Sequence, residues 1–214
     1  MMDKLKEKID EVISTRNEVV RRELHVSDIY QCPRKIIFRI KGIPEKITAR
    51  QFNIFQNGHA VHERIEGYFK KAGILIDSEQ PIKENEMGIK GRYDLKFKDP
   101  NDNEIKIGDV KSINLRTLRE PKKEHIAQVM LYMHFEGIRK GKLIYESKQT
   151  QELFYFDVEY DQITIESILG WFKDMQELVD KGAAPATNND KNKFPCSWGA
   201  DAGSRCPYYD ICWK

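Results

Sequence analysis

The chain has 214 residues, of which 40% are hydrophobic and 33% charged, and its formal net charge is +2. This composition predicts a folded domain with its own core and excludes an intrinsically disordered chain. No apolar run reaches the ~20 residues of a membrane-spanning helix, and the first residues, MMDKLKEKIDEVI, do not resemble a signal peptide. We therefore expect a cytoplasmic protein without a membrane partner.

Hydrophobic periodicity predicts five helices, over about 3–23, 28–41 (capped by Ser27), 47–72, 121–136 and 162–181. Five further segments have the character of strands: 74–86, 89–98, 104–113, 141–147 and 152–160. The tail from residue 183 is expected to be irregular. This order of elements predicts an α/β fold with a mixed central sheet flanked by helices, rather than a doubly wound parallel sheet.

The segments 89–98 and 104–113 are joined by DPNDN, which has the composition of a hairpin turn. If the turn centres on residues 101–102, Asp94 lies directly opposite Asp109, with Cβ atoms ~5 Å apart. Two carboxylates at that distance repel unless a cation lies between them, and oxygen ligands suit Mg²⁺ or Mn²⁺.

Lys111 lies two residues beyond Asp109 and projects from the same face of the strand. An ammonium there would stabilise charge on a phosphate or orient an attacking water. The alternative is an ordinary solvated strand face, which is what an Asp-x-Lys sequence usually forms.

Asp94 followed by Asp109-Val110-Lys111 resembles the core of PD-(D/E)XK nucleases, with Asp at the second acidic position, where Glu is commoner. GHAVHERIE and AQVMLYMHF resemble two further motifs of the RecB-like branch, Gly-x-x-x-His and Gln-x-x-x-Tyr. The resemblance implies a restriction-endonuclease-like core with a metal site formed by His62, Asp94, Asp109 and the Val110 carbonyl. It also implies that Lys111, Gln128 and Tyr132 support catalysis. His59 competes with His62 but lacks the motif spacing.

One cysteine, Cys32, lies near the amino terminus, and three lie in the tail: Cys196, Cys206 and Cys212. In a reducing compartment four such thiols suit metal ligation, and their chemistry admits a [4Fe–4S] cluster, a [2Fe–2S] cluster or Zn²⁺. HVSDIYQCPRK and CPYYDIC resemble cluster segments of RecB-like nucleases, including the CRISPR-associated exonuclease "Cas-four" family, which implies [4Fe–4S]. Nine residues separate Cys196 from Cys206, where that family usually has two.

These motifs predict a single nuclease domain, with its core in 45–182 and an iron–sulfur region that joins 24–44 to 183–214. The resemblance implies an exonuclease acting on single-stranded DNA ends, with DNA-processing or CRISPR adaptation proteins as partners. The alternatives are a non-catalytic iron–sulfur module that holds DNA ends for an integrase or repair complex, and a zinc-stabilised interaction protein. Candidate DNA contacts are Arg34, Lys35, Arg39, Lys41, Arg116, Arg119, Lys122, Lys123, Lys191, Lys193, Trp198, Tyr208, Tyr209 and Trp213.

Overall fold

The computed structural model describes residues 4–14, 21–114, 120–182, 184–186, 190–198 and 205–213. The chain forms two compact units, one from 1–22, 31–57 and 178–214 and the other from 23–30 and 58–177. All four cysteines belong to the first unit, and the predicted hairpin belongs to the second. The predicted single domain with a core at 45–182 and a separate cluster region stays a prediction.

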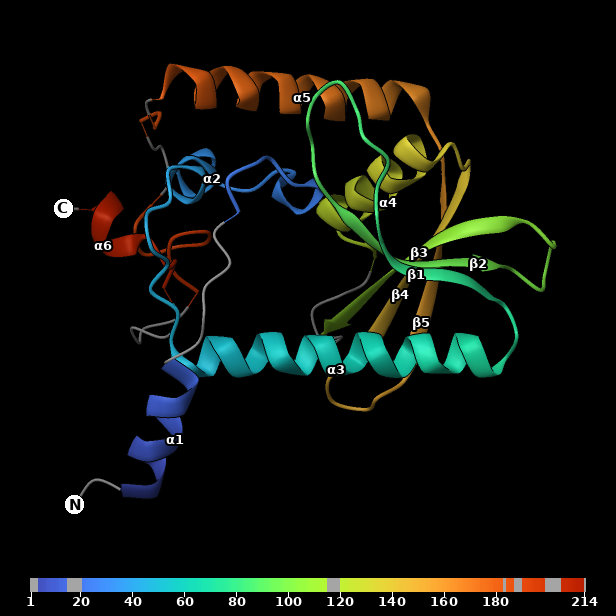
Figure 1. The fold of residues 1–214 in the computed structure, drawn as a ribbon, viewed down its shortest axis with the longest axis horizontal. Coiled ribbons are helices and arrows are strands. Elements are labelled where there is room, and N and C mark those ends of the chain that lie inside the picture. Colours follow the sequence, from blue (N-terminus) through green and yellow to red (C-terminus); the bar gives the residue numbers. More distant parts are fainter. Residues whose placement is uncertain are drawn as a thin grey trace. The chain divides into compact units, whose positions relative to one another are not determined.

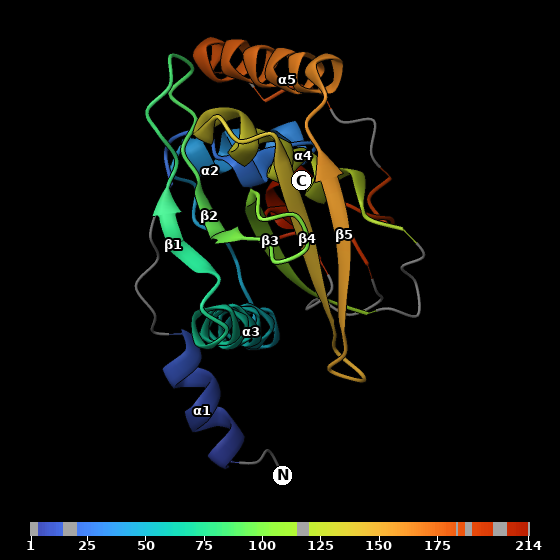
Figure 2. The same ribbon diagram turned by 90° about the vertical axis from the view of Figure 1, so that its right-hand side faces the viewer.

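The second unit is built on a five-stranded mixed sheet (Figure 2). Its strands are β1 (Leu75–Pro81), β2 (Arg92–Lys98), β3 (Ile105–Ile113), β4 (Lys140–Ser147) and β5 (Leu153–Glu159), in the order β1-β2-β3-β4-β5. Neighbouring strands are antiparallel except β3 and β4, which are parallel and are connected through α4 (Lys123–Glu136). The predicted mixed sheet is therefore confirmed.

Helices cover both faces of this sheet. The second half of α3 (Ala49–Lys71) packs its apolar stripe on one face in a buried cluster of Val61, Ile65, Phe69, Leu95, Phe97, Val110 and Ile144. On the other face α4 approaches so closely that a Cβ at Gly141 would lie 2.4 Å from Val129 Cγ1. Figure 1 shows α5 (Gln162–Lys181) following β5. None of the described helices has the length and apolarity needed to cross a bilayer.

The β2–β3 hairpin has the predicted register, since Leu95 pairs with Gly108 and Lys98 with Ile105. The buried carboxylate of Asp99 organises the turn, because it accepts hydrogen bonds from the Asn101 backbone at 2.9 Å and side chain at 2.8 Å. A turn fixed in this way sets which residues of the two strands face each other.

Near both ends of the chain the elements differ from the prediction. The helix expected over 3–23 is α1 (Lys4–Ser14), and residues 21–23 are not helical. The helix expected after Ser27 is a 3-10 turn at Val26–Asp28 followed by a separate α2 (Pro33–Ile40). Pro33 lacks a backbone N–H and fits the first turn of a helix, so α2 begins there with Cys32 at its N-cap. The tail, expected to be irregular, contains the short helix α6 (Tyr209–Cys212).

Candidate metal centre

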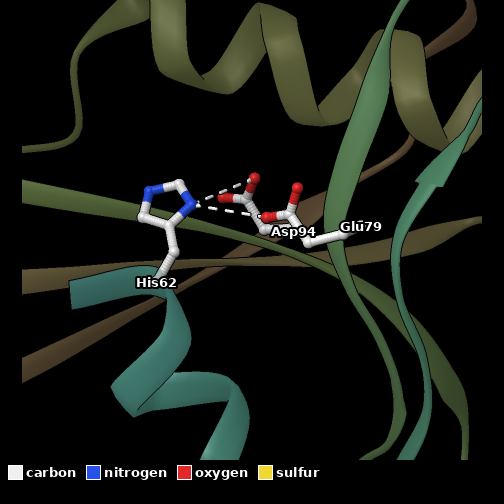
Figure 3. Close-up of side chains that lie close together, drawn as sticks. All are labelled: His62, Glu79 and Asp94. Atoms are coloured by element: carbon white, nitrogen blue, oxygen red, sulfur yellow. Dashed lines mark ion pairs between the residues drawn. The ribbon is translucent and has the colours of Figure 1, made fainter. Parts of the chain in front are cut away.

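Three side chains with metal-ligand atoms converge from three elements of the second unit: His62 of α3, Glu79 of β1 and Asp94 of β2. The Nδ1 atom of His62 lies 3.5 Å from Asp94 Oδ1 and 3.7 Å from Glu79 Oε1. Figure 3 shows the imidazole facing both carboxylates. One imidazole nitrogen with two carboxylates is a ligand set suited to a divalent cation such as Mn²⁺ or Mg²⁺.

Asp94 is held in place by its second oxygen, since the Val110 backbone N–H donates to Asp94 Oδ2 at 2.6 Å. Burial raises the pKa of Asp94 to about 6, and the negative charge of Asp109 contributes to the rise. The positive charge of Lys111, the charge of His62 and the Val110 N–H act in the opposite direction without cancelling the rise. A nearby cation would therefore favour the ionised form of this carboxyl.

Asp109 and Lys111 form an ion pair within β3. The Lys111 Nζ lies 2.8 Å from Asp109 Oδ1 and 2.7 Å from Oδ2, and Asp109 is only 1% exposed. Burial alone would lower the pKa of Lys111, but the carboxylates of Asp109 and Asp94 outweigh it and raise the pKa. Among the described residues, the group of ligand atoms within 4.8 Å of one another contains Asp94 but not Asp109. That these two aspartates share one ion stays a prediction.

A second polar pair lies beside Lys111 on the α4 side of the sheet. Tyr145 of β4 is fully buried and pairs with Lys111 in the parallel ladder. Its hydroxyl accepts a hydrogen bond from the Lys122 backbone N–H at 3.3 Å and lies 2.9 Å from His125 Nδ1. Burial lowers the pKa of His125 to about 3. The lowered pKa favours the neutral imidazole, whose Nδ1 shares this hydrogen bond with the Tyr145 hydroxyl.

Gln128 and Tyr132 both lie on α4, four residues apart, and so share one helix face. Gln128 is half-buried, whereas Tyr132 is buried against Gly91, where a Cβ would lie 3.2 Å from Tyr132 Cε1. Their roles in substrate binding stay predictions. Of the two candidate histidines, His59 is exposed and His62 faces the carboxylates.

Glu79 is the site residue that sequence reasoning missed. It lies in the strand Leu75–Pro81, and no functional motif surrounds it in the sequence. Its position beside Asp94 depends on the pairing of β1 with β2 and on its own backbone, which has a φ of 51°. Neither feature has a signature in the sequence that would have identified this residue.

None of the four cysteines forms a disulfide within the described part of the chain. Cys32 caps α2, Cys212 ends α6, and the Cys206 backbone N–H donates to the Cys196 carbonyl at 2.9 Å. Burial raises the pKa of the Cys196 and Cys206 thiols, and the nearby thiols of Cys32 and Cys212 add to the rise. Cys32 and Cys212 therefore lie within electrostatic reach of both Cys196 and Cys206.

Two other contacts connect these cysteine segments. The Arg34 guanidinium donates to Cys212 Sγ at 3.4 Å and to the Pro185 carbonyl at 2.8 Å. Tyr208, a candidate for base stacking, is fully buried and donates to the Ile43 carbonyl at 3.1 Å, so it packs inside the unit instead. The candidate DNA contacts Arg116 and Arg119 lie outside the described residues.

No protein-family model and no curated protein matches the chain. Solved structures do match it. The structure of SSO0001 has a TM-score of 0.59 at 20% identity and covers 98% of this chain and 93% of that chain. The alkaline exonuclease LHK-Exo from Laribacter hongkongensis has a TM-score of 0.58 at 14% identity, over 75% of this chain and 89% of that chain. A phage related exonuclease from Haemophilus somnus 129PT has a TM-score of 0.54 at 13% identity, over 79% of this chain and 97% of that chain. The chain therefore shares the mixed α/β fold of these solved exonuclease structures.

Proposed function

We propose that the chain is a metal-dependent DNA exonuclease of the RecB-like PD-(D/E)XK type that acts on single-stranded DNA ends. The observation that carries this proposal is the arrangement of His62 and Asp94 beside the buried Asp109–Lys111 pair. The same residue types in the same order occur in the nuclease motifs that the sequence resembles. The fold shared with two solved exonucleases supports the proposal independently of these motifs.

The residues fit a divalent ion, because two partly buried carboxylates and an imidazole nitrogen are aimed at one another. Such an ion, when bound, polarises a phosphate oxygen and lowers the pKa of water. Asp94 and His62 would hold it, with the Asp109 carboxylate and the Val110 carbonyl as further ligands. Lys111 would place its positive charge where negative charge develops on the phosphate in the transition state.

We propose that the four cysteines hold a [4Fe–4S] cluster, as in the "Cas-four" family that the sequence resembles. A cluster would join residues near Cys32 to the carboxyl-terminal tail and so stabilise the first unit. Among the described residues no three cysteine sulfurs lie within 4.8 Å of one another. Four thiolates at ~2.3 Å from one zinc ion would lie about 4 Å apart, so binding of either metal group would draw the cysteine segments closer together.

The nuclease proposal is tested by the cleavage of labelled single-stranded DNA in Mn²⁺, comparing the wild-type chain with Lys111→Ala. Substrates with open and chemically blocked ends separate end-directed cleavage from internal cleavage. We expect loss of open-ended substrate only, and a fall of roughly a hundredfold in the variant. DNA binding by the wild type without any Mn²⁺-dependent cleavage would instead favour a non-catalytic partner of an integrase or repair complex, such as one that acts in CRISPR adaptation.

The cluster proposal is tested by anaerobic purification with iron and sulfide analysis. A brown protein that absorbs near ~400 nm and contains about four irons per chain is expected for a cubane. A colourless protein that contains one zinc ion would contradict the cluster and leave the nuclease proposal intact.

A further inference from the structure

Glu79 has a backbone conformation that is unusual for a strand residue. Its φ of 51° lies in the left-handed region, which costs a residue with a Cβ about 1 kcal/mol. The strand around it is nevertheless paired, since Ser78 lies opposite Leu95 and Gln80 opposite Tyr93. Glu79 therefore lies level with Asp94, on the neighbouring strand.

The two oxygens of the Glu79 carboxylate have different surroundings. Oε2 is 2.6 Å from Nε of Arg92, which fixes the orientation of the carboxylate. Oε1 is directed toward His62 Nδ1, at 3.7 Å. Arg92 therefore occupies one oxygen and leaves the other directed at the imidazole. Figure 3 shows the Glu79 and Asp94 carboxylates facing the His62 ring.

His62, Glu79 and Asp94 are spaced like the ligands of a single metal ion. Atoms bound at ~2.1 Å to a single ion lie about 3 to 4 Å apart. The separations of 3.5 and 3.7 Å from His62 Nδ1 fall within this range. A hydrogen-bonded His–carboxylate pair would be shorter, near 2.8 Å.

We infer that Glu79 is a ligand of the divalent ion, together with His62 and Asp94; this inference rests on the proposed metal-dependent nuclease. Arg92 keeps Glu79 monodentate by occupying its second oxygen. A site with an imidazole nitrogen accepts Mn²⁺ more readily than Mg²⁺, which prefers oxygen ligands and water. The additional carboxylate also adds negative charge beside Asp94 and so favours binding of the cation.

The test is Mn²⁺ binding to the full chain, measured by titration calorimetry and by electron paramagnetic resonance, so that no cleavage is needed as a readout. The variants are Glu79→Gln, Glu79→Asn, Asp94→Asn and, as a matched control, Glu84→Gln at an exposed position after β1. Asn tolerates a positive φ better than most residues, so Glu79→Asn removes the charge without opposing the backbone. Circular dichroism melts identify any variant that does not fold.

We expect Glu79→Gln and Glu79→Asn each to weaken Mn²⁺ binding roughly tenfold or more, while Glu84→Gln binds like the wild type. Mn²⁺ affinity within twofold of the wild type in a folded Glu79 variant, together with its loss in Asp94→Asn, would overturn the role of Glu79 and leave the proposed nuclease standing. No Mn²⁺ binding by the wild type would instead remove the metal-dependent nuclease on which the inference rests.

Discussion

The ammonium of Lys111 lies within 2.8 Å of both carboxylate oxygens of Asp109, two residues away on the same strand. Asp109 is almost fully enclosed, with 1% of its side chain exposed, and Lys111 is partly exposed at 22%. A buried carboxylate is stable in its ionised form only with a counter-charge, and Lys111 supplies it. The same lysine is the residue to which the nuclease proposal assigns charge stabilisation, so its removal affects both stability and activity.

Lys111→Ala is expected to lower the free energy of unfolding by about 3 kcal/mol, because Asp109 is left buried and without its counter-charge. Urea denaturation measures this loss. The double variant Lys111→Met/Asp109→Asn should recover most of the stability, since no buried charge remains, but it should not recover DNA cleavage. A double variant that is no more stable than Lys111→Ala would contradict the account of the pair.

Asp94 predicts a dependence of stability on pH in metal-free protein. Its pKa is raised to about 6 in the folded chain, above its ordinary value of 3.8. The folded state therefore holds this proton more tightly than the unfolded state, and that contribution to stability is lost as the pH rises through 6. Asp94→Asn removes the titration, so its stability relative to the wild type should increase between pH 4 and pH 8.

Urea denaturation at pH 4 and pH 8, in the presence of a metal chelator, measures this difference in stability. Asp174→Asn, at an exposed position, is the control. Added Mn²⁺ should stabilise the wild type above pH 6, where Asp94 is ionised, and should have less effect on Asp94→Asn. A constant difference between wild type and Asp94→Asn across the pH range would show that Asp94 has an ordinary pKa.

Much of the second unit could be predicted because its signals are local. The sequence DPNDN specifies a turn, and the turn sets the predicted register in which Leu95 pairs with Gly108. The helix predicted over 47–72 ends as expected at Gly73. The φ of Gly73 is 71°, a left-handed conformation that glycine adopts with little strain. Periodicity and turn chemistry are properties of a few consecutive residues, so a single sequence contains them.

The features that were missed depend on contacts between distant segments. Glu79 reaches the site only because β1 pairs with β2 and the chain adopts a positive φ there. His125 meets Tyr145 only because α4 lies on β4. The start of α2 was placed too early because Ser27 is a good capping residue, whereas Pro33 determines where the helix begins.

The hairpin turn depends on a second buried ion pair. Lys106 Nζ lies 2.8 Å from Asp99 Oδ2 and 3.0 Å from Asp102 Oδ2, and the Lys106 and Asp99 side chains are 6% and 2% exposed. Lys106→Met should destabilise the protein by about 3 kcal/mol, because Asp99 loses its buried partner. Asp99→Asn added to that variant should restore part of the loss. Urea denaturation checks both, and Lys140→Met, at a more exposed pair, should cost less than 1 kcal/mol.

The Asp99 carboxylate also makes the stability of the hairpin turn sensitive to acid. Although burial alone would raise the pKa of Asp99, its hydrogen bonds from Lys106 and Asn101 lower the pKa overall, well below 3.8. A lowered pKa contributes stability that is present above 3.8 and is lost as the pH falls further. Wild-type protein should therefore lose stability below pH 4 more steeply than the Asp99→Asn/Lys106→Met variant. Parallel curves for the two proteins would contradict this role.

His125 predicts acid sensitivity in a higher pH range. Its pKa of about 3 lies below its ordinary value of 6.5, so on acidification the unfolded chain takes up a proton that the folded chain does not. Stability should fall between pH 7.5 and pH 5, by about 1 to 2 kcal/mol from this residue. His125→Gln should flatten the pH dependence by that amount in urea denaturation, whereas His59→Gln, at an exposed position, should leave it unchanged. A wild-type slope in His125→Gln would contradict a lowered pKa for the buried imidazole.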